Sequence, residues 1–134
     1  KRGYKPRPLD GIWATPPFLH NGSVPTLFQL LSPVNERATQ FHVGSFEFDP
    51  TFVGFQTAEF PGAFLLDTRI KGNGNGGHEF RDGCRQDGVI GRFLEPEERL
   101  ALIEYLKVLG NPELEAGLTP VEPRPWTPGP KCEG

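Results

Sequence analysis

Glycine and proline interrupt this sequence so often that long regular elements have little room. The chain of 134 residues contains 17 glycines and 15 prolines. Proline fixes φ and lacks an N–H donor, and glycine loses the most conformational freedom when it is placed in a helix or strand. The same chain contains 11 phenylalanines, whereas disordered chains are poor in aromatic residues. The composition therefore predicts one compact domain that is loop-rich but packed.

Charge and hydropathy argue against two classes of partner. The formal net charge is −3 and the pI is about 5.6, so there is no basic footprint for nucleic acid. No apolar run approaches the roughly 18 residues of a membrane-spanning helix, and we expect no membrane span. The chain contains no methionine, even at its first position. We interpret it as the interior of a longer precursor, either cleaved or only partly covered.

Two helices are expected. Thr26 and Gln29 form a capping-box pattern at the start of a short one, which Ser32-Pro33 ends. A longer one is expected over residues 95–110, because proline and glutamates open it and Gly110 suits its end. Its apolar stripe, which must be buried against another surface, contains Leu102, Ile103, Leu106 and Leu109.

The remaining segments predict little regular structure. Residues 41–55 indicate short strands and turns, because their aromatic residues are broken by glycine and proline. Residues 1–12 read as an extended arm that docks on a partner surface, and the proline-rich residues 111–134 as an extended tail. Cys84 and Cys132 are too few and too far apart for a zinc or haem-attachment motif. They form one disulfide in an oxidising compartment, or remain two free thiols.

Three histidines are the candidate ligands, and a structural or surface role is the simpler alternative for each. His78 ends the loop "GNGNGGH", whose glycines let backbone approach a flat cofactor closely. His20 follows two prolines, and its fixed position suits either a ligand or a hydrogen bond to a cofactor carboxylate. His42 lies on the face opposite to its apolar neighbours, which favours neither role. The carbonyl oxygens of the stretch from Thr15 to Pro17 offer the oxygen ligands that calcium prefers.

Four ordered motifs carry a resemblance to a known family. They are "YKPRPLDGIWATPPFLHNGSVPTLFQLL", "FHVGSFEFDP" with "VGF", "LLDTRIKGNGNGGHEF" and "LEPEERLALIEYLKVL". Together they resemble the C-terminal portion of dihaem c-type cytochromes of the bacterial cytochrome c peroxidase and MauG superfamily, and more closely the branch of the rubber oxygenase RoxA. The resemblance implies a mainly α fold with much irregular structure. It would be a loop-rich portion of a cytochrome c-like haem domain with few short strands, over residues 1–110, before the tail at 111–134.

The resemblance also implies roles for individual residues. "TPPFLH" is similar to a family motif in which backbone oxygens, here those of Thr15 and Pro17, help to bind calcium. His20 would lie near the haem and serve communication between haems. The methionine that ligates iron in the peroxidases is absent, and the oxygenase-like branch uses a histidine instead. This implies His78 as the axial ligand of haem iron, with His42 as the second choice, and a backbone carbonyl or Glu79 as the partner of the other ring nitrogen.

The function implied is the C-terminal part of a periplasmic or otherwise exported haem oxidoreductase of the peroxidase or oxygenase class. No Cys-x-x-Cys-His run occurs, so haem c would be attached to a haem-bearing upstream segment or partner chain, and a redox partner protein is implied. The alternative is an electron-transfer or structural subunit of a multihaem assembly without its own catalysis. A third interpretation is an interaction module that has lost its haem. We also expect that the isolated chain is not a self-sufficient fold, because the apolar stripe at residues 102–109 and the arm at residues 1–12 need a partner surface.

Overall fold

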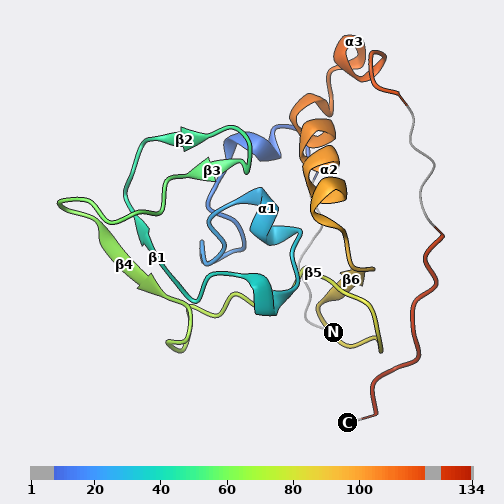
Figure 1. Cartoon of the computed structure of the whole chain (residues 1–134), viewed down its shortest axis with the longest axis horizontal. Helices are drawn as coiled ribbons and strands as arrows, with labels where there is room; N and C mark the ends of the chain where they lie inside the picture. The colour runs from blue at the N-terminus through green and yellow to red at the C-terminus, as the bar shows by residue number, and fades with distance from the viewer. Residues whose placement is uncertain (1–7, 120–124, 134) are drawn as a thin grey trace.

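The computed structural model describes residues 8–119 and 125–133. Its helices and strands are short and are joined by turns (Figure 1). In chain order they are the 3-10 turn η1 Ile12–Ala14, α1 Leu27–Leu30, the 3-10 turn η2 Val34–Glu36, β1 Gln40–Val43, β2 Phe48–Asp49, β3 Gly54–Phe55, β4 Phe64–Asp67, β5 Glu79–Phe80, β6 Val89–Gly91, α2 Pro96–Val108 and α3 Pro112–Glu115.

The expectation of a mainly α fold is wrong. Among the described residues only α2 is a helix longer than four residues. Proline removes an N–H donor and glycine favours turns, so most of the chain cannot sustain a helix. Gly44 and Gly72, for example, have φ of 108° and 97° in the segments that follow β1 and β4. The short strands expected between residues 41 and 55 are present, as β1, β2 and β3.

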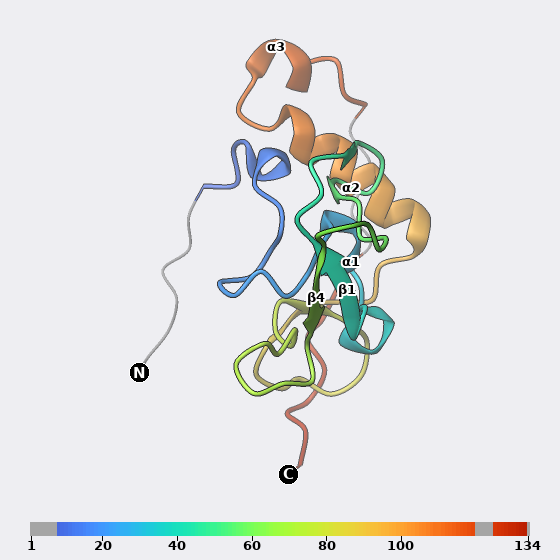
Figure 2. The same ribbon diagram turned by 90° about the vertical axis from the view of Figure 1, so that its left-hand side faces the viewer.

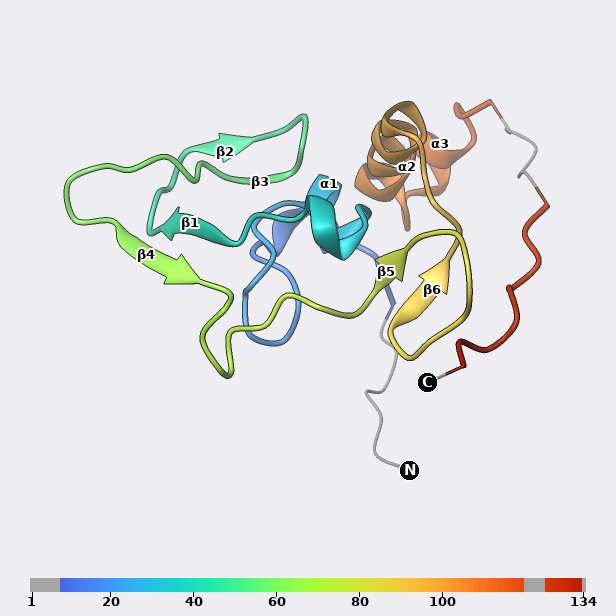
Figure 3. The same cartoon turned by 60° about the horizontal axis from the view of Figure 1, so that its bottom comes forward.

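The strands form three separate two-stranded ribbons rather than one sheet. β1 pairs with β4 and β2 with β3, both antiparallel, while β5 pairs with β6 in parallel. The first two ribbons lie on one side of α1, and α2 lies on the other side (Figures 1 and 3). The β5–β6 ribbon lies below α2 in Figure 1.

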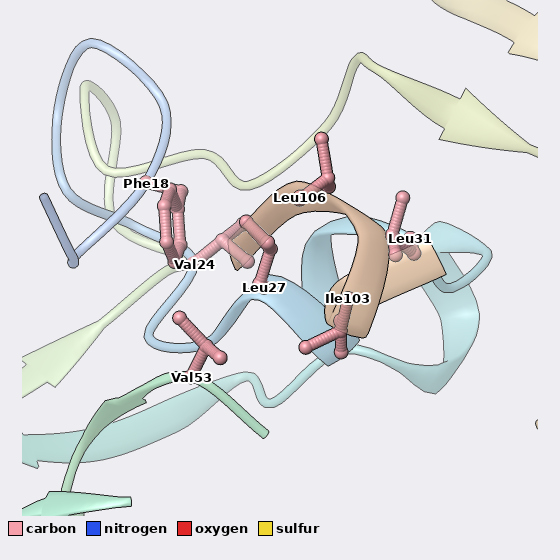
Figure 4. Close-up of a cluster of buried hydrophobic side chains, with 7 residues drawn as sticks. All are labelled: Phe18, Val24, Leu27, Leu31, Val53, Ile103 and Leu106. Carbon is pink, nitrogen blue, oxygen red and sulfur yellow. The ribbon is translucent and has the colours of Figure 1, made fainter. Parts of the chain in front are cut away.

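The core joins segments that are far apart in the sequence. Its buried side chains are Phe18, Val24, Leu27, Leu31, Val53, Ile103 and Leu106 (Figure 4). Ile103 is fully buried, so the predicted stripe of α2 finds its surface within this chain. The arm predicted at residues 1–12 lies mostly outside the described residues, but Ile12 at its end packs against the core.

Local signals set both helices. Glu95 and Glu98 form a reciprocal capping box around Pro96 at the start of α2, and Gly110 follows its end with φ of 87°. At α1, the hydroxyl of Thr26 accepts a hydrogen bond from the Gln29 N–H at 3.2 Å, as expected. The reciprocal bond is not made, because the Gln29 side chain accepts the Ala38 N–H at 2.9 Å instead. The second half of that predicted capping box is therefore wrong.

The tail is tied to the rest of the molecule. Cys84 and Cys132 form a disulfide, which decides between the two alternatives for these cysteines. Beside it, the Arg85 N–H donates to the Pro130 carbonyl at 2.7 Å, and the Cys132 N–H donates to the Arg85 carbonyl at 3.0 Å. The segment expected to be extended from residue 111 begins instead with α3, at the top of Figure 2. Within the described ranges, no helix is long and apolar enough to cross a membrane.

Candidate functional site

The motif "TPPFLHNGS" forms a tight turn that is anchored in the core. Phe18 and Val24 exchange backbone hydrogen bonds of 2.7 and 3.3 Å, and both side chains are buried. Gly22 adopts φ of 67° within this turn. The two hydrogen bonds close the base of the turn and fix its tip, where His20 is exposed.

The same turn binds the glycine-rich loop at residues 72–78. The Asn21 side-chain amide donates to the carbonyl oxygens of Gly72 and Gly74, at 3.1 and 2.9 Å. The Ser23 hydroxyl donates to the Gly74 carbonyl at 2.9 Å. Two motifs about 50 residues apart in the sequence are thus joined directly by side-chain donors.

Arg37 binds the second half of the loop. Its guanidinium donates to the carbonyl oxygens of Gln29, Leu30, Ser32, Asn75, Gly77 and His78. Three of these acceptors belong to the end of α1 and the residues after it, and three belong to the loop. Arg37 is 4% exposed. Burial lowers its pKa, and the nearby Glu79 carboxylate opposes this change.

These contacts turn the loop carbonyls inward and leave His78 at the surface. His78 is exposed and has φ of 47°, in the left-handed region, and its own carbonyl accepts from Arg37 at 3.1 Å. The neighbouring Glu79 carboxylate accepts from the Val34 N–H at 3.1 Å and from Arg81 at 3.2 Å. Both carboxylate oxygens of Glu79 thus already accept hydrogen bonds, one from the backbone of η2 and one from an arginine. The backbone of His78 is therefore held through its carbonyl oxygen, and the residue is accessible from solvent.

His42 occupies a different place, in the β1–β4 ribbon. It is half-buried, lies opposite Leu65, and its N–H donates to the Thr57 carbonyl at 3.1 Å. It lines a small cavity of about 70 Å³ together with Pro17. Phe41, the preceding residue, is buried, as expected from the alternation of apolar and polar residues in this strand. In the described part of the chain, no three His, Cys, Asp or Glu side chains gather in a way that could hold a metal.

The proposed calcium ligands lie on an exposed turn. The Thr15 hydroxyl donates to the Ile12 carbonyl at 3.1 Å. The carbonyl oxygens of Thr15 and Pro17 accept no hydrogen bond from another described residue. They offer two oxygens, whereas calcium takes about six to eight. A complete site therefore needs ligands from elsewhere.

A larger open cavity of about 570 Å³ lies beside α1 and the β2–β3 ribbon, and its carboxylates are already in use. Asp49 accepts the N–H groups of Thr51 and Phe52. Glu36 pairs with the buried Arg99 at 2.7 Å. Both lining carboxylates thus have structural partners.

The anchoring residues Asn21, Ser23 and Arg37 were not expected from the sequence. Asn21 and Ser23 lie in the motif "TPPFLHNGS" but had no role assigned to them, and Arg37 lies outside the four motifs. The glycine-rich loop itself was one signal in the sequence. If such a loop packs on the rest of the molecule, its buried carbonyl oxygens must accept hydrogen bonds from donors elsewhere in the chain. Sequence alone does not say which donors these are.

Comparison with known proteins adds an assignment for the first part of the chain. Residues 3–42 match the family model described as RoxA-like, cytochrome c-like. This part of the chain is a cytochrome c-like, RoxA-related region. The match confirms the RoxA-related part of the resemblance, while membership of the dihaem peroxidase and MauG superfamily stays a prediction.

Two relatives from Sinorhizobium fredii (strain NBRC 101917 / NGR234) are similar over most of the chain. The uncharacterized protein y4iJ is 58% identical over 106 residues, which are 79% of this chain and 18% of that protein. The uncharacterized protein y4iM is 37% identical over 120 residues, which are 79% of this chain and 27% of that protein. The chain thus spans less than a third of the length of either. No solved structure matches it significantly.

Proposed function

We propose that this chain is the C-terminal part of an exported haem oxidoreductase, where it completes a haem pocket with His78 as an axial ligand. The observation that carries the proposal is the junction between the RoxA-related region and the glycine-rich loop. Asn21, Ser23 and Arg37 all lie within the matched residues 3–42, and all three bind the loop that ends in His78. The cytochrome c-like region and the candidate ligand are therefore one hydrogen-bonded unit.

The side chains present suit one axial position and no covalent attachment. A c-type haem is attached through two cysteine thiols beside a histidine, whereas both cysteines of this chain are joined in a disulfide. His78 is exposed, so its imidazole is accessible to a group on another segment. The haem c would accordingly be held by an upstream segment or a partner chain that carries Cys-x-x-Cys-His.

The position of the ligand favours an electron-relay role for this part of the protein. Haem supplies one-electron chemistry, and the identity and surroundings of the axial ligand tune its potential. A histidine on iron closes that coordination position to substrate. The peroxidase- or oxygenase-like step would then take place at another haem, outside this chain, with electrons supplied by a redox partner protein.

Export is supported by the disulfide between Cys84 and Cys132. Structural disulfides persist in oxidising compartments such as the bacterial periplasm and are rare in the cytosol. We therefore place the protein in the periplasm or beyond it.

Calcium at the Thr15 and Pro17 carbonyls belongs to the same proposal. The turn that carries them lies in the RoxA-related region, and the missing ligands would come from the haem-bearing segment. Metal analysis of the full protein, followed by chelation, tests this. We expect bound calcium and a lower melting temperature after its removal, because calcium would bind only the folded form. Absence of calcium before chelation would refute it.

Substitution of each histidine in the full haem-bearing protein tests the ligand. His78→Ala should convert a six-coordinate low-spin haem into a high-spin or water-ligated one. His42→Ala is the matched control, since His42 lies in the β1–β4 ribbon, and it should leave that spectrum unchanged. His20→Ala should preserve the spin state and disturb transfer between haems. Loss of the low-spin spectrum in His42→Ala alone would reassign the ligand, and an unchanged spectrum in all three variants would reject the haem-pocket role.

A further inference from the structure

We propose that Arg37 is the positioning residue for His78: its guanidinium clamps the backbone of the glycine-rich loop so that the imidazole keeps one placement. This inference rests on the proposed function of His78 as an iron ligand. It adds a residue that touches neither the imidazole nor the cofactor and acts through the loop.

The geometry of the clamp comes from the planar guanidinium. Nε donates to the carbonyls of Gln29 and Ser32, at 3.1 and 3.3 Å, on the side of α1. Nη1 donates only to loop carbonyls, those of Asn75 and Gly77. Nη2 donates once to each side. The side chain therefore bridges the end of α1 to the loop, and every nitrogen is used.

His78 is the last residue of the loop that the clamp reaches. Nη2 donates to the Leu30 carbonyl at 3.1 Å and to the His78 carbonyl at 3.1 Å. One nitrogen thus links the final turn of α1 with the backbone of the candidate ligand. A shift of the His78 backbone would break this bond directly.

Packing holds little of this part of the loop apart from Gly77, whose Cα would lie 3.2 Å from a Cβ added at Gly88. A Cβ added at Gly74 or Gly76 would meet no heavy atom within 4 Å, so the loop backbone has open space beside it there. Glycine also has the widest backbone freedom of any residue. Hydrogen bonds are consequently the main restraint on the loop, and Arg37 supplies three of them.

The acceptors explain why arginine is required. Every hydrogen-bond partner of Arg37 is a backbone carbonyl. The Glu79 carboxylate interacts with the guanidinium through the Coulomb attraction between their charges. Arginine offers five N–H donors in a rigid plane, whereas lysine is a point charge with three donors. Arg37→Lys would keep the positive charge and lose the bridge.

Arg99 provides a matched control within the same molecule. It is 2% exposed, and it donates to the Leu94 carbonyl, the Ser32 hydroxyl and the Glu36 carboxylate. Its guanidinium also stacks on the Phe28 and Phe93 rings, and it has no hydrogen bond to the glycine-rich loop. Arg99→Lys therefore perturbs a buried arginine without touching the loop.

The test compares Arg37→Lys, Arg99→Lys and His78→Ala in the full haem-bearing protein. Cyanide binding to the ferric haem reports how fast the histidine leaves iron. Hydrogen exchange of the Glu79 amide, which follows His78 directly and donates to the Gly88 carbonyl at 2.7 Å, reports opening of the loop. For Arg37→Lys we expect cyanide binding and loop exchange to be about tenfold faster, the change that accompanies loss of one or two hydrogen bonds, together with a shifted reduction potential. Arg99→Lys should lower the melting temperature and leave these three readouts unchanged.

The two ways of failing are distinct. If His78→Ala alters the spectrum but Arg37→Lys behaves like Arg99→Lys in cyanide binding and loop exchange, the positioning role is rejected and the proposed function stands. If His78→Ala leaves the low-spin spectrum intact, the ligand assignment fails, and with it the role of Arg37 toward iron. Hydrogen exchange is measured on the folded protein, so it reports on the clamp even where a variant binds haem poorly.

Discussion

Helix α2 and the glycine-rich loop at 72–78 both contact the part of the chain around α1, yet they are held there by different kinds of interaction. The helix places Ile103 and Leu106 in the core, and both side chains are buried. The loop is bound through its carbonyl oxygens, by donors from Asn21, Ser23 and Arg37. Apolar burial is non-directional and scales with area, whereas hydrogen bonds depend on angle and distance.

This difference separates stability from placement. Burial of an apolar side chain contributes roughly 1.5–3 kcal/mol, whereas an intramolecular hydrogen bond contributes about 0.5–1.5 kcal/mol net. Helix α2 should therefore account for more of the folding free energy than the loop. The loop should account for more of the geometry at His78, because its restraints are directional. Substitutions in the two regions should separate these effects.

The largest expected effect is that of Ile103→Ala in α2. Removing a fully buried isoleucine should cost about 4 kcal/mol of unfolding free energy, because transfer free energy is lost and a cavity remains. Chemical denaturation measures this cost, and Ile103→Val should lose only about 1 kcal/mol. The haem spectrum of the folded fraction should not change. If the spin state changed under conditions where Ile103→Ala is still folded, α2 would also control the geometry at His78, contrary to this prediction.

A smaller effect is expected for Asn21→Ala in the turn that binds the loop. Two hydrogen bonds to the carbonyls of Gly72 and Gly74 are lost, which should cost about 1–2 kcal/mol. Hydrogen exchange of the Asn73 amide, which lies between the two lost contacts and donates to the Ile70 carbonyl at 2.9 Å, should accelerate. The control is Asn111→Ala: Asn111 caps α3 through its side chain, and loss of such a cap costs about 1 kcal/mol. Similar exchange of the loop in both variants would show that Asn21 does not hold it.

The same contrast explains what the sequence could predict. Helix α2 was predicted from the proline and glutamates at its start and from Gly110 after its end, because these signals are local in the sequence. The capping box between Glu95 and Glu98 was not foreseen. The anchors of the loop could not be predicted, since Arg37 and its loop acceptors are about 40 residues apart and no short pattern pairs them. The three histidines are exposed or half-buried, and their roles as ligands stay predictions. The contact that holds the His78 backbone runs through its carbonyl oxygen.

The mainly α expectation failed for a related reason. It was carried over from the resemblance to a haem domain, whereas the local composition of this chain indicated loops. Where the two sources disagreed, the glycine and proline content was the better guide, because it acts on each segment directly. The disulfide, in contrast, could only be posed as an alternative, since the approach of Cys84 to Cys132 depends on the path of the tail.

The smallest expected effect concerns Asp67, at the end of β4 where the chain enters the loop. Hydrogen bonds from Arg69 hold the pKa of Asp67 well below its usual range, and the Gln40 amide adds a bond at 2.9 Å. A carboxyl with a lowered folded-state pKa stabilises the fold above its unfolded pKa of about 3.9, and this contribution is lost as the pH falls below that value. The effect should be small because the Arg69 side chain is largely exposed to solvent, where salt screens its interaction with Asp67.

Asp67→Asn isolates this contribution, since asparagine keeps the shape and does not titrate. The difference in denaturation midpoint between pH 5 and pH 3 should be smaller in this variant than in the unsubstituted protein, and Arg69→Gln should reduce it in the same direction. Asn73 donates to the Asp67 carbonyl at 3.1 Å, so any change in hydrogen exchange should be confined to the start of the loop. If the pH dependence of the denaturation midpoint is unchanged in Asp67→Asn, other carboxyl groups are responsible for that dependence. A change in exchange that reached His78 would mean that the loop moves as one unit rather than being fixed separately at its two ends, by Asn21 and by Arg37.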